Sequence, residues 1–182
     1  KGNNDICKYL IKNININYNS KVTKIKYASN FWTITLNNNE CVYFKYLIVT
    51  CPFPQSKELT SKYAKKPLSR ISVKMQPNVT VMAVYKNYKI LPVSSIKFNN
   101  QFISWASQEN TKARFKSNKV LWTIQCSKFF SKKIINLVKK KRNKYLSIVL
   151  REFQNLTGYK IKNIIFKNIH GWKYSSNVSK TP

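Results

Sequence analysis

Apolar and polar residues alternate along most of the chain, which is the pattern of half-buried β-strands. Two alternating runs, 20–27 and 31–36, are separated by the turn residues Ser29-Asn30 and followed by the asparagines 37–39, so they predict a small antiparallel meander. A weaker alternation of Ile14, Ile16 and Tyr18 predicts another strand before the meander. Further strands are predicted at 71–75, 79–85, 102–107, 120–126 and 161–169.

The segment FKYLIVTCPFPQ, residues 44–55, has a different pattern, because its residues 46–49 are all apolar. An unbroken apolar run of this length predicts a central strand that is covered on both faces. Pro52 and Pro54 remove backbone donors just after it, at the carboxyl edge where open α/β sheets bind ligands. The alternative is that the two prolines only end a buried strand.

Helical periodicity predicts three helices. A short one, capped by Asn3 or Asn4, places Ile6, Cys7, Leu10 and Ile11 on one face, and another covers 58–65 before Pro67. A long helix begins at the cap residue Ser131, carries an apolar stripe to about Leu156 and ends at Gly158. The predicted fold class is therefore α+β: a mostly antiparallel sheet with a long helix packed on it, a β-meander and one buried strand.

Composition limits the classes of protein to which the chain can belong. Its 182 residues are 43% hydrophobic, enough for a sizeable core, and no apolar run is long enough to span a bilayer or serve as a signal peptide. We therefore expect a cytoplasmic protein without a membrane partner. Four cysteines lie far apart without CxxC spacing, which favours buried free thiols and predicts no metal site.

The formal net charge of +29 raises the question of a nucleic-acid partner. Arginine, which phosphate-reading surfaces favour, occurs at only four positions, while Lys, Asn, Ile, Tyr and Phe are raised together as in AT-rich coding sequence. We therefore do not expect a nucleic-acid partner. The dense run 139–142 is interpreted as a solvated helix face, with an electrostatic contact surface as the alternative.

Four segments together resemble flavin-dependent amine oxidases, and within them the renalase-like group. The first is LxxxININxxSKVTKIxxxxxFWTITLxxxxxxxFKYLIVTCPFPQ, which ends at Gln55, and the others are ISWASQENTKAR (103–114), VLWTIQCSKFFS (120–131) and HGWKYSS (170–176). Their order and spacing cover nearly the whole chain. The resemblance implies an FAD-dependent oxidoreductase that oxidises a small-molecule substrate, an amine or a dihydronicotinamide, with oxygen as the acceptor.

The resemblance also implies positions for the cofactor and the substrate. The FAD contacts would be Val22, whose backbone lies by the adenine end, with Thr50, Cys51 and Pro52. The candidates for the substrate cavity are Asn110, Lys112, Arg114, Gln125 and Trp172. No catalytic residue is assigned, since Gln125 stands where many relatives have a histidine and cannot titrate. Gly171 likewise stands where an arginine is often found.

The resemblance divides the chain into the central part of an FAD-binding domain (1–55), a substrate-binding domain (56–171) and a return towards the FAD-binding domain (172–182). Only Gly2, Gly158 and Gly171 occur, so the chain has no GxGxxG loop for the pyrophosphate. We therefore expect a fragment of a two-domain flavoprotein, lacking both ends of the flavin domain and inactive alone. The alternative function is a basic nucleic-acid-binding module whose lysines hold phosphates and whose Tyr and Phe rings stack on bases.

Overall fold

The computed structural model describes residues 5–63, 71–112 and 117–178, which form two compact units, unit 1 (Lys1–Val73) and unit 2 (Lys74–Pro182). Both have antiparallel sheets and helices, so the α+β fold class is confirmed. Among the described residues, no helix is long and apolar enough to cross a membrane.

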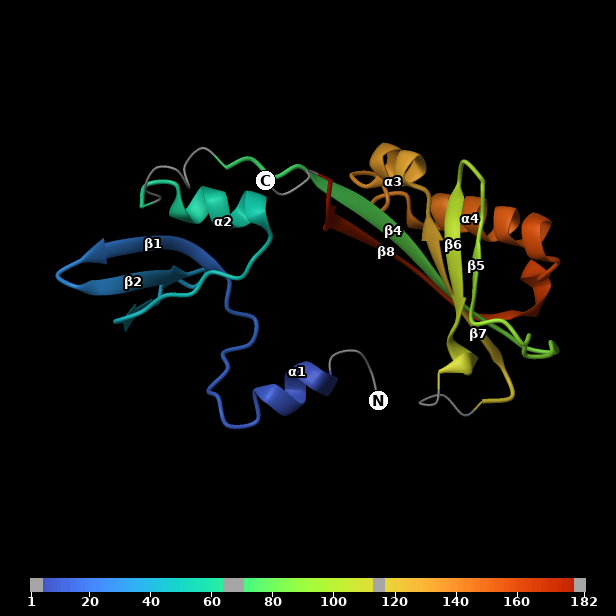
Figure 1. Ribbon diagram of the computed structural model, residues 1–182, viewed down its shortest axis with the longest axis horizontal. Helices are drawn as coiled ribbons and strands as arrows, with labels where there is room; N and C mark the ends of the chain where they lie inside the picture. Colours follow the sequence, from blue (N-terminus) through green and yellow to red (C-terminus); the bar gives the residue numbers. More distant parts are fainter. Residues whose placement is uncertain (1–4, 64–70, 113–116, 179–182) are drawn as a thin grey trace. The chain divides into compact units, whose positions relative to one another are not determined.

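Unit 1 is built on the predicted meander. Strands β1 (Val22–Ala28), β2 (Phe31–Leu36) and β3 (Cys41–Phe44) pair antiparallel in that order, in the blue to cyan part of Figure 1. Their turns use Ser29, Asn30 and Asn39 at positive φ, a conformation that short polar side chains tolerate. Helix α1 (Asp5–Leu10) buries no residue, whereas Leu59 of α2 (Phe53–Thr60) packs on the small core of Ile25, Ile34 and Leu36.

Three sequence predictions for unit 1 differ from the structure. Residues 46–49 form no strand, and Tyr46 and Ile48 are 79% and 86% exposed. A buried strand needs neighbours on both sides, and no described strand pairs with this segment. The alternation at 14–18 is likewise not a strand. Helix α2 begins at Phe53, earlier than predicted, because a proline fits the first turn of a helix, where no intrahelical N–H bond is lost.

Among the described residues of unit 2, five strands form one sheet, and all of them pair antiparallel. In spatial order they are β5 (Ser95–Lys97), β6 (Ile103–Gln108), β7 (Val120–Cys126), β4 (Met75–Tyr85) and β8 (Ile164–Asn177), with the short 3-10 turns η2 (Glu109–Thr111) and η3 (Ile161–Asn163). The predicted strand at 79–85 is part of β4, whereas the one predicted at 71–75 is not a separate strand: residues 71–74 form no strand and Met75 is the first residue of β4. Strand β4 accommodates Pro77 at an irregularity in its pairing with β8, where a ladder donor is not needed.

The long helix predicted from Ser131 is two helices, α3 (Lys128–Ile134) and α4 (Arg142–Thr157), joined by turns. No apolar residue stands between Val138 and Tyr145, so the apolar stripe that would hold a continuous helix is interrupted. The cap of α3 is Ser127, whose Oγ accepts from the N–H of Phe130 at 3.1 Å. The predicted stop at Gly158 is confirmed by its φ of 78°.

Both helices of unit 2 cover one face of the sheet (Figure 1). Alternate residues of the central strands, such as Val81 of β4 and Ile124 of β7, are fully buried there against Ile134, Val149 and other helix residues. Tyr85, Tyr88, Trp122, Phe153 and Tyr159 form an aromatic cluster in this core, with ring centroids between 4.5 and 6.4 Å apart. The other residues of these strands lie on the opposite face, which the helices leave free.

Candidate functional site

A hollow of about 340 Å³ in unit 1 brings together two of the residues assigned to the cofactor. It is lined by residues of β1, of α2 and of the segment before α2: Lys21, Val22, Thr23, Cys51, Gln55, Glu58 and Leu59. The pairing of β1 with β2 is irregular next to Val22: Val22 pairs with Leu36 and Lys24 with Thr35, so Thr23 between them has no pairing partner on β2. A residue left out of the ladder in this way can offer its backbone groups to a ligand, and Thr23 also lines the hollow.

Hydrogen bonds fix the segment around Cys51 on the far side of this hollow. Ser56 Oγ donates to the Cys51 carbonyl oxygen at 2.6 Å and lies 3.3 Å from Cys51 Sγ. Pro52 is the N-cap residue of α2, and Thr50 before it is exposed. Val22 and Cys51 therefore face the same space, while Thr50 and Pro52 flank it in sequence.

The hollow fits one end of a flavin dinucleotide. Val22 and Leu59 supply apolar wall, and Gln55, Glu58 and Thr23 supply hydrogen-bonding groups, a combination that a purine ring can use. Its volume lies near the lower end of the range of ligand pockets, roughly 300–1,000 Å³. These residues suit the adenine end, as the resemblance implies.

The free face of the sheet in unit 2 carries a row of side chains that crosses all its strands. Cross-strand pairing places Gln125 of β7 opposite Thr80 on one side and Trp105 on the other. Trp105 in turn pairs with Lys97, and Thr80 pairs with His170. Directly opposed residues of antiparallel strands point to the same face of a sheet. This row, which we call the open-face row, thus comprises Lys97, Trp105, Gln125, Thr80 and His170.

Trp172 lies beside the open-face row. It pairs with Asn78 on β4, two residues from the pair of Thr80 with His170, so it points to the same face. Its ring centroid is 4.4 Å from that of His170, and its side chain is 56% exposed. Trp172 is thus an exposed residue in the middle of β8 and not part of the core, and the structure places it on one face with Gln125.

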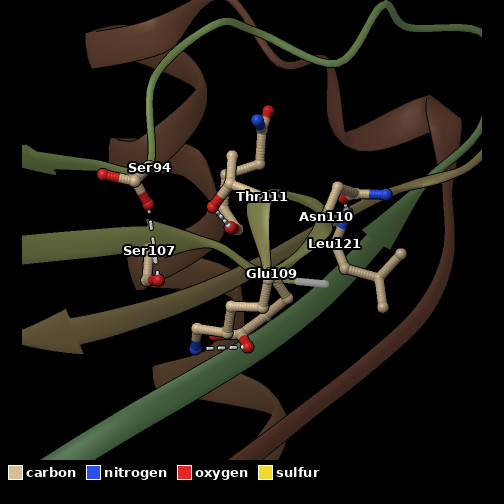
Figure 2. Close-up of polar contacts among 8 residues, drawn as sticks. Ser94, Ser107, Glu109, Asn110, Thr111 and Leu121 are labelled. Carbon is tan, nitrogen blue, oxygen red and sulfur yellow. Dashed lines mark hydrogen bonds and ion pairs between the residues drawn. The ribbon is translucent and has the colours of Figure 1, made fainter. Parts of the chain in front are cut away.

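The loop candidates lie elsewhere and are held by the protein itself (Figure 2). Asn110 Oδ1 accepts from the N–H of Leu121 at 2.7 Å, and Nδ2 donates to the carbonyl oxygen of Lys119 at 2.7 Å. Lys112 Nζ is 2.5 Å from Glu109 Oε2. Leu121 and Gln125 are four residues apart on β7, or about 13 Å, so the structure does not bring these candidates to Gln125. Arg114 lies outside the described residues.

The buried ionisable groups of unit 2 lie on the covered face and are kept neutral. Burial raises the pKa of Cys126 from its ordinary value of 9.0 to about 12. Burial also raises the pKa of Tyr85, with additional contributions from Tyr88 and Tyr159. A thiol that stays protonated is a poor nucleophile, so the structure does not support a catalytic role for Cys126.

Sequence reasoning did not select Trp105, Thr80 or His170 as site residues. The signal was present in part, since the alternation in 79–85 puts Thr80 on the face opposite Val79 and Val81. The register that aligns Thr80 with Gln125 and His170 depends on strands 45 to 90 residues away, and a single sequence does not reveal it.

Comparisons with known proteins agree on the fold. Thirty-five chains of solved structures match this chain. One is described as a putative protoporphyrinogen oxidase from Exiguobacterium sp. 255-15, with a TM-score of 0.77 and 12% sequence identity over 98% of this chain. This chain spans 40% of the length of that one. A search of curated proteins found no match.

The sequence pattern of one protein family, described as flavin containing amine oxidoreductase, matches residues 1–174. This confirms the resemblance to the amine oxidases and makes a flavin, FAD or a related one, the cofactor of the family. Because the match covers most of its length, the chain belongs to the flavin-containing amine oxidoreductases.

Proposed function

We propose that the protein is an FAD-dependent oxidoreductase of the renalase-like kind, which oxidises a dihydronicotinamide or an amine and uses oxygen as the acceptor. The observation that carries the proposal is the open-face row, with Trp172 beside it. Its polar and aromatic side chains form no part of the hydrophobic core, so the packing of that core does not require them.

The chemistry of the row favours a flat substrate that carries an amide. Trp105 and Trp172 offer large rigid rings for stacking, and Gln125 can both donate to and accept from a carboxamide. Thr80 Oγ1 donates to Asn78 Oδ1 at 2.8 Å, which orients that amide on the same face. A dihydronicotinamide has both the ring and the carboxamide, so we place it before a simple amine.

We propose that Val22, Thr50, Cys51 and Pro52 contact FAD, with the backbone of Val22 at the start of β1 beside the adenine end and the other three residues ahead of α2. When bound, FAD would supply the redox chemistry, namely hydride acceptance from the reduced carbon of the substrate and electron transfer to oxygen. The chain's own residues bind and orient the substrate. Since the 182 residues contain no GxGxxG loop, we expect no turnover from them alone.

The predicted division into 1–55, 56–171 and 172–182 and a cytoplasmic location belong to the same proposal. In this proposal Asn110 and Lys112 have a structural role. The side-chain amide of Asn110 bonds to the backbone of Lys119 and Leu121, and Lys112 forms an ion pair with Glu109. They act on the substrate only if these bonds exchange when the substrate binds.

The test uses the flavin-loaded protein from the complete gene. We expect a dihydronicotinamide to bleach the flavin absorbance without oxygen, and hydrogen peroxide to form once oxygen is admitted. Gln125→Leu should lower kcat/KM about tenfold, the value of one or two hydrogen bonds. Lys167→Gln is the matched control, since Lys167 is exposed on β8 but pairs with Ala83 and so points away from the row.

Two results would contradict the proposal. If neither a dihydronicotinamide nor an amine bleaches the flavin, the substrate class is wrong. If Gln125→Leu and Trp172→Phe both leave kcat/KM at the value of Lys167→Gln, the open face is not the substrate site.

A further inference from the structure

Residues 128–144 of unit 2 form a continuous basic segment, which includes α3, the turns after it and the start of α4. Eight of its 17 residues are lysine or arginine and none is acidic, against 34 lysines and arginines in all 182 residues. The nearest acidic residues in sequence are Glu109 and Glu152. The segment is therefore far denser in positive charge than the rest of an already basic chain.

The fold turns these charges outward. Phe130, Ile134, Val138 and Tyr145 are buried and recur at helical spacing, so they hold the segment on the sheet. Close packing adds to this, because Ile135 and Val138 lie against Gly171 of β8, where an added Cβ would be 2.9 and 3.0 Å from their side chains. The cations all lie on the exposed side: Lys128, Lys132, Lys133, Lys139, Lys140, Lys141, Arg142 and Lys144.

Apolar side chains are exposed among these cations. Phe129 is 68% exposed, and Lys132 and Lys133 follow it at three and four residues, so they share its side of α3. Leu137 is 39% exposed in the turn that precedes Lys139. A helix face that only meets solvent gains nothing from an exposed phenylalanine beside its lysines.

From this combination we propose that residues 128–144 form a peripheral docking surface for anionic lipid headgroups, with Phe129 and Leu137 entering the interface. Clusters of four to eight lysines or arginines on an amphipathic element are typical of binding to acidic phospholipids, and an aromatic residue anchors such elements at the boundary of headgroups and acyl chains. Such a surface needs no helix that spans the membrane. The proposal therefore differs from the sequence analysis in one respect, because it gives the protein a membrane surface as a partner.

Two other partners fit the segment less well. A nucleic-acid surface favours arginine for its bidentate fork, but Arg142 is the only arginine here and its Nη2 donates to Asn168 Oδ1 of β8. A protein interface is depleted in lysine, which makes up seven of the eight cations. Charge complementarity together with exposed Phe129 therefore favours the lipid.

The test is co-sedimentation of the 182-residue chain with vesicles of phosphatidylcholine that contain phosphatidylserine, and with vesicles of phosphatidylcholine alone. We expect binding to the first and little to the second. Neutralising Lys139, Lys140 and Lys141 with glutamine should weaken binding about a hundredfold, since each lysine near an anionic surface contributes about fivefold. The matched control neutralises Lys86, Lys89 and Lys119, which surround another hollow in the same unit.

Phe129→Ser separates the lipid from a polyanion. It should weaken vesicle binding roughly tenfold through lost apolar contact and leave the binding of a single-stranded RNA unchanged, while circular dichroism shows an intact fold. The proposal is overturned if both triple variants lose the same affinity, because the net charge alone then governs binding. It is also overturned if RNA binds more tightly than the anionic vesicles, or if Phe129→Ser leaves vesicle binding unchanged.

Discussion

Replacing Tyr85 by phenylalanine should stabilise unit 2, although it removes a polar group from the core. Tyr85 is fully buried in the aromatic cluster, and its hydroxyl has no hydrogen-bond partner among the described residues. Burying a hydroxyl without a partner costs about 1–3 kcal/mol. The lost oxygen leaves little empty space, so we expect Tyr85→Phe to raise the free energy of unfolding by about 1 kcal/mol.

The same substitution at Tyr88 gives the matched control. Its ring lies 6.0 Å from that of Tyr85, but its hydroxyl oxygen accepts from the N–H of Lys160 at 2.6 Å and donates to the carbonyl oxygen of Gly158 at 3.3 Å. Tyr88→Phe removes both bonds and should lower the free energy of unfolding by about 1 kcal/mol. Two chemically identical changes in one cluster are thus expected to have opposite signs.

The change in the free energy of unfolding of each variant can be measured by urea unfolding followed by amide hydrogen exchange in β4 and β7, because these amides report on unit 2 alone. The raised pKa of Tyr85 adds a pH test. The folded state favours the protonated phenol, whereas the unfolded chain can ionise it. The free energy of unfolding of the wild-type protein is therefore unaffected by this group below about pH 10 and falls as the pH rises above it. The advantage of Tyr85→Phe should therefore grow at alkaline pH. A Tyr85→Phe variant as unstable as Tyr88→Phe would refute the reasoning.

Two further predictions concern the seam between helices and sheet. Gly171→Ala should lower the free energy of unfolding of unit 2 by about 1 kcal/mol, since its Cβ would meet Ile135 Cδ1 and Val138 Cγ1. Ile135→Val, which removes Cδ1, should recover part of this loss in a double-mutant cycle, and purely additive effects would contradict the packing argument. Cys126 is buried as the sequence predicts, but Cys41 is exposed, contrary to that prediction. Because burial raises the pKa of Cys126 to about 12, its thiol should resist iodoacetamide in the native state while Cys41 reacts, as mass spectrometry can follow. Equal rates for the two thiols would contradict its burial. Because burial keeps this thiol protonated in the folded state, its effect on the stability of unit 2 should be constant below about pH 9, and the stability should fall as the pH rises above that value.

Local periodicity predicted the strands that are covered on one face. The boundaries of 31–36 and 120–126 agree with β2 and β7, and 102–107 differs from β6 by one residue at each end. In these strands every second residue packs on the core, so burial on one face produces an alternating pattern that can be recognised in the sequence. The run 46–49 differs because a strand covered on both faces is defined by its neighbours, and the sequence of the run says nothing about them.

Polar contacts between distant segments were beyond the reach of sequence reasoning. Ser131 is as good a helix cap by residue type as Ser127, but its hydroxyl accepts from the N–H of Val79 on β4 at 3.1 Å. Asn110 is a plausible substrate ligand by type, yet its amide holds the backbone on either side of Val120. Both side chains form hydrogen bonds with residues that come close only when the chain folds. The partner of Ser131 is 52 residues away in sequence, and those of Asn110 are about ten residues away.

Gly171 connects the departure from the family pattern with the packing of unit 2. It pairs with Val79, a fully buried residue, so a side chain at 171 would point to the covered face and not to the open face beside Trp172. An arginine there, as the family often has, would put its charge against Ile135 and Val138, where the space beside Cα is already filled. Glycine lets the segment 135–138 lie directly on β8, and this contact holds the turns that carry the lysines at 139–141. A side chain at 171 would therefore lie on the covered face, so the glycine there leaves the open face with Gln125, Thr80 and Trp172 unchanged.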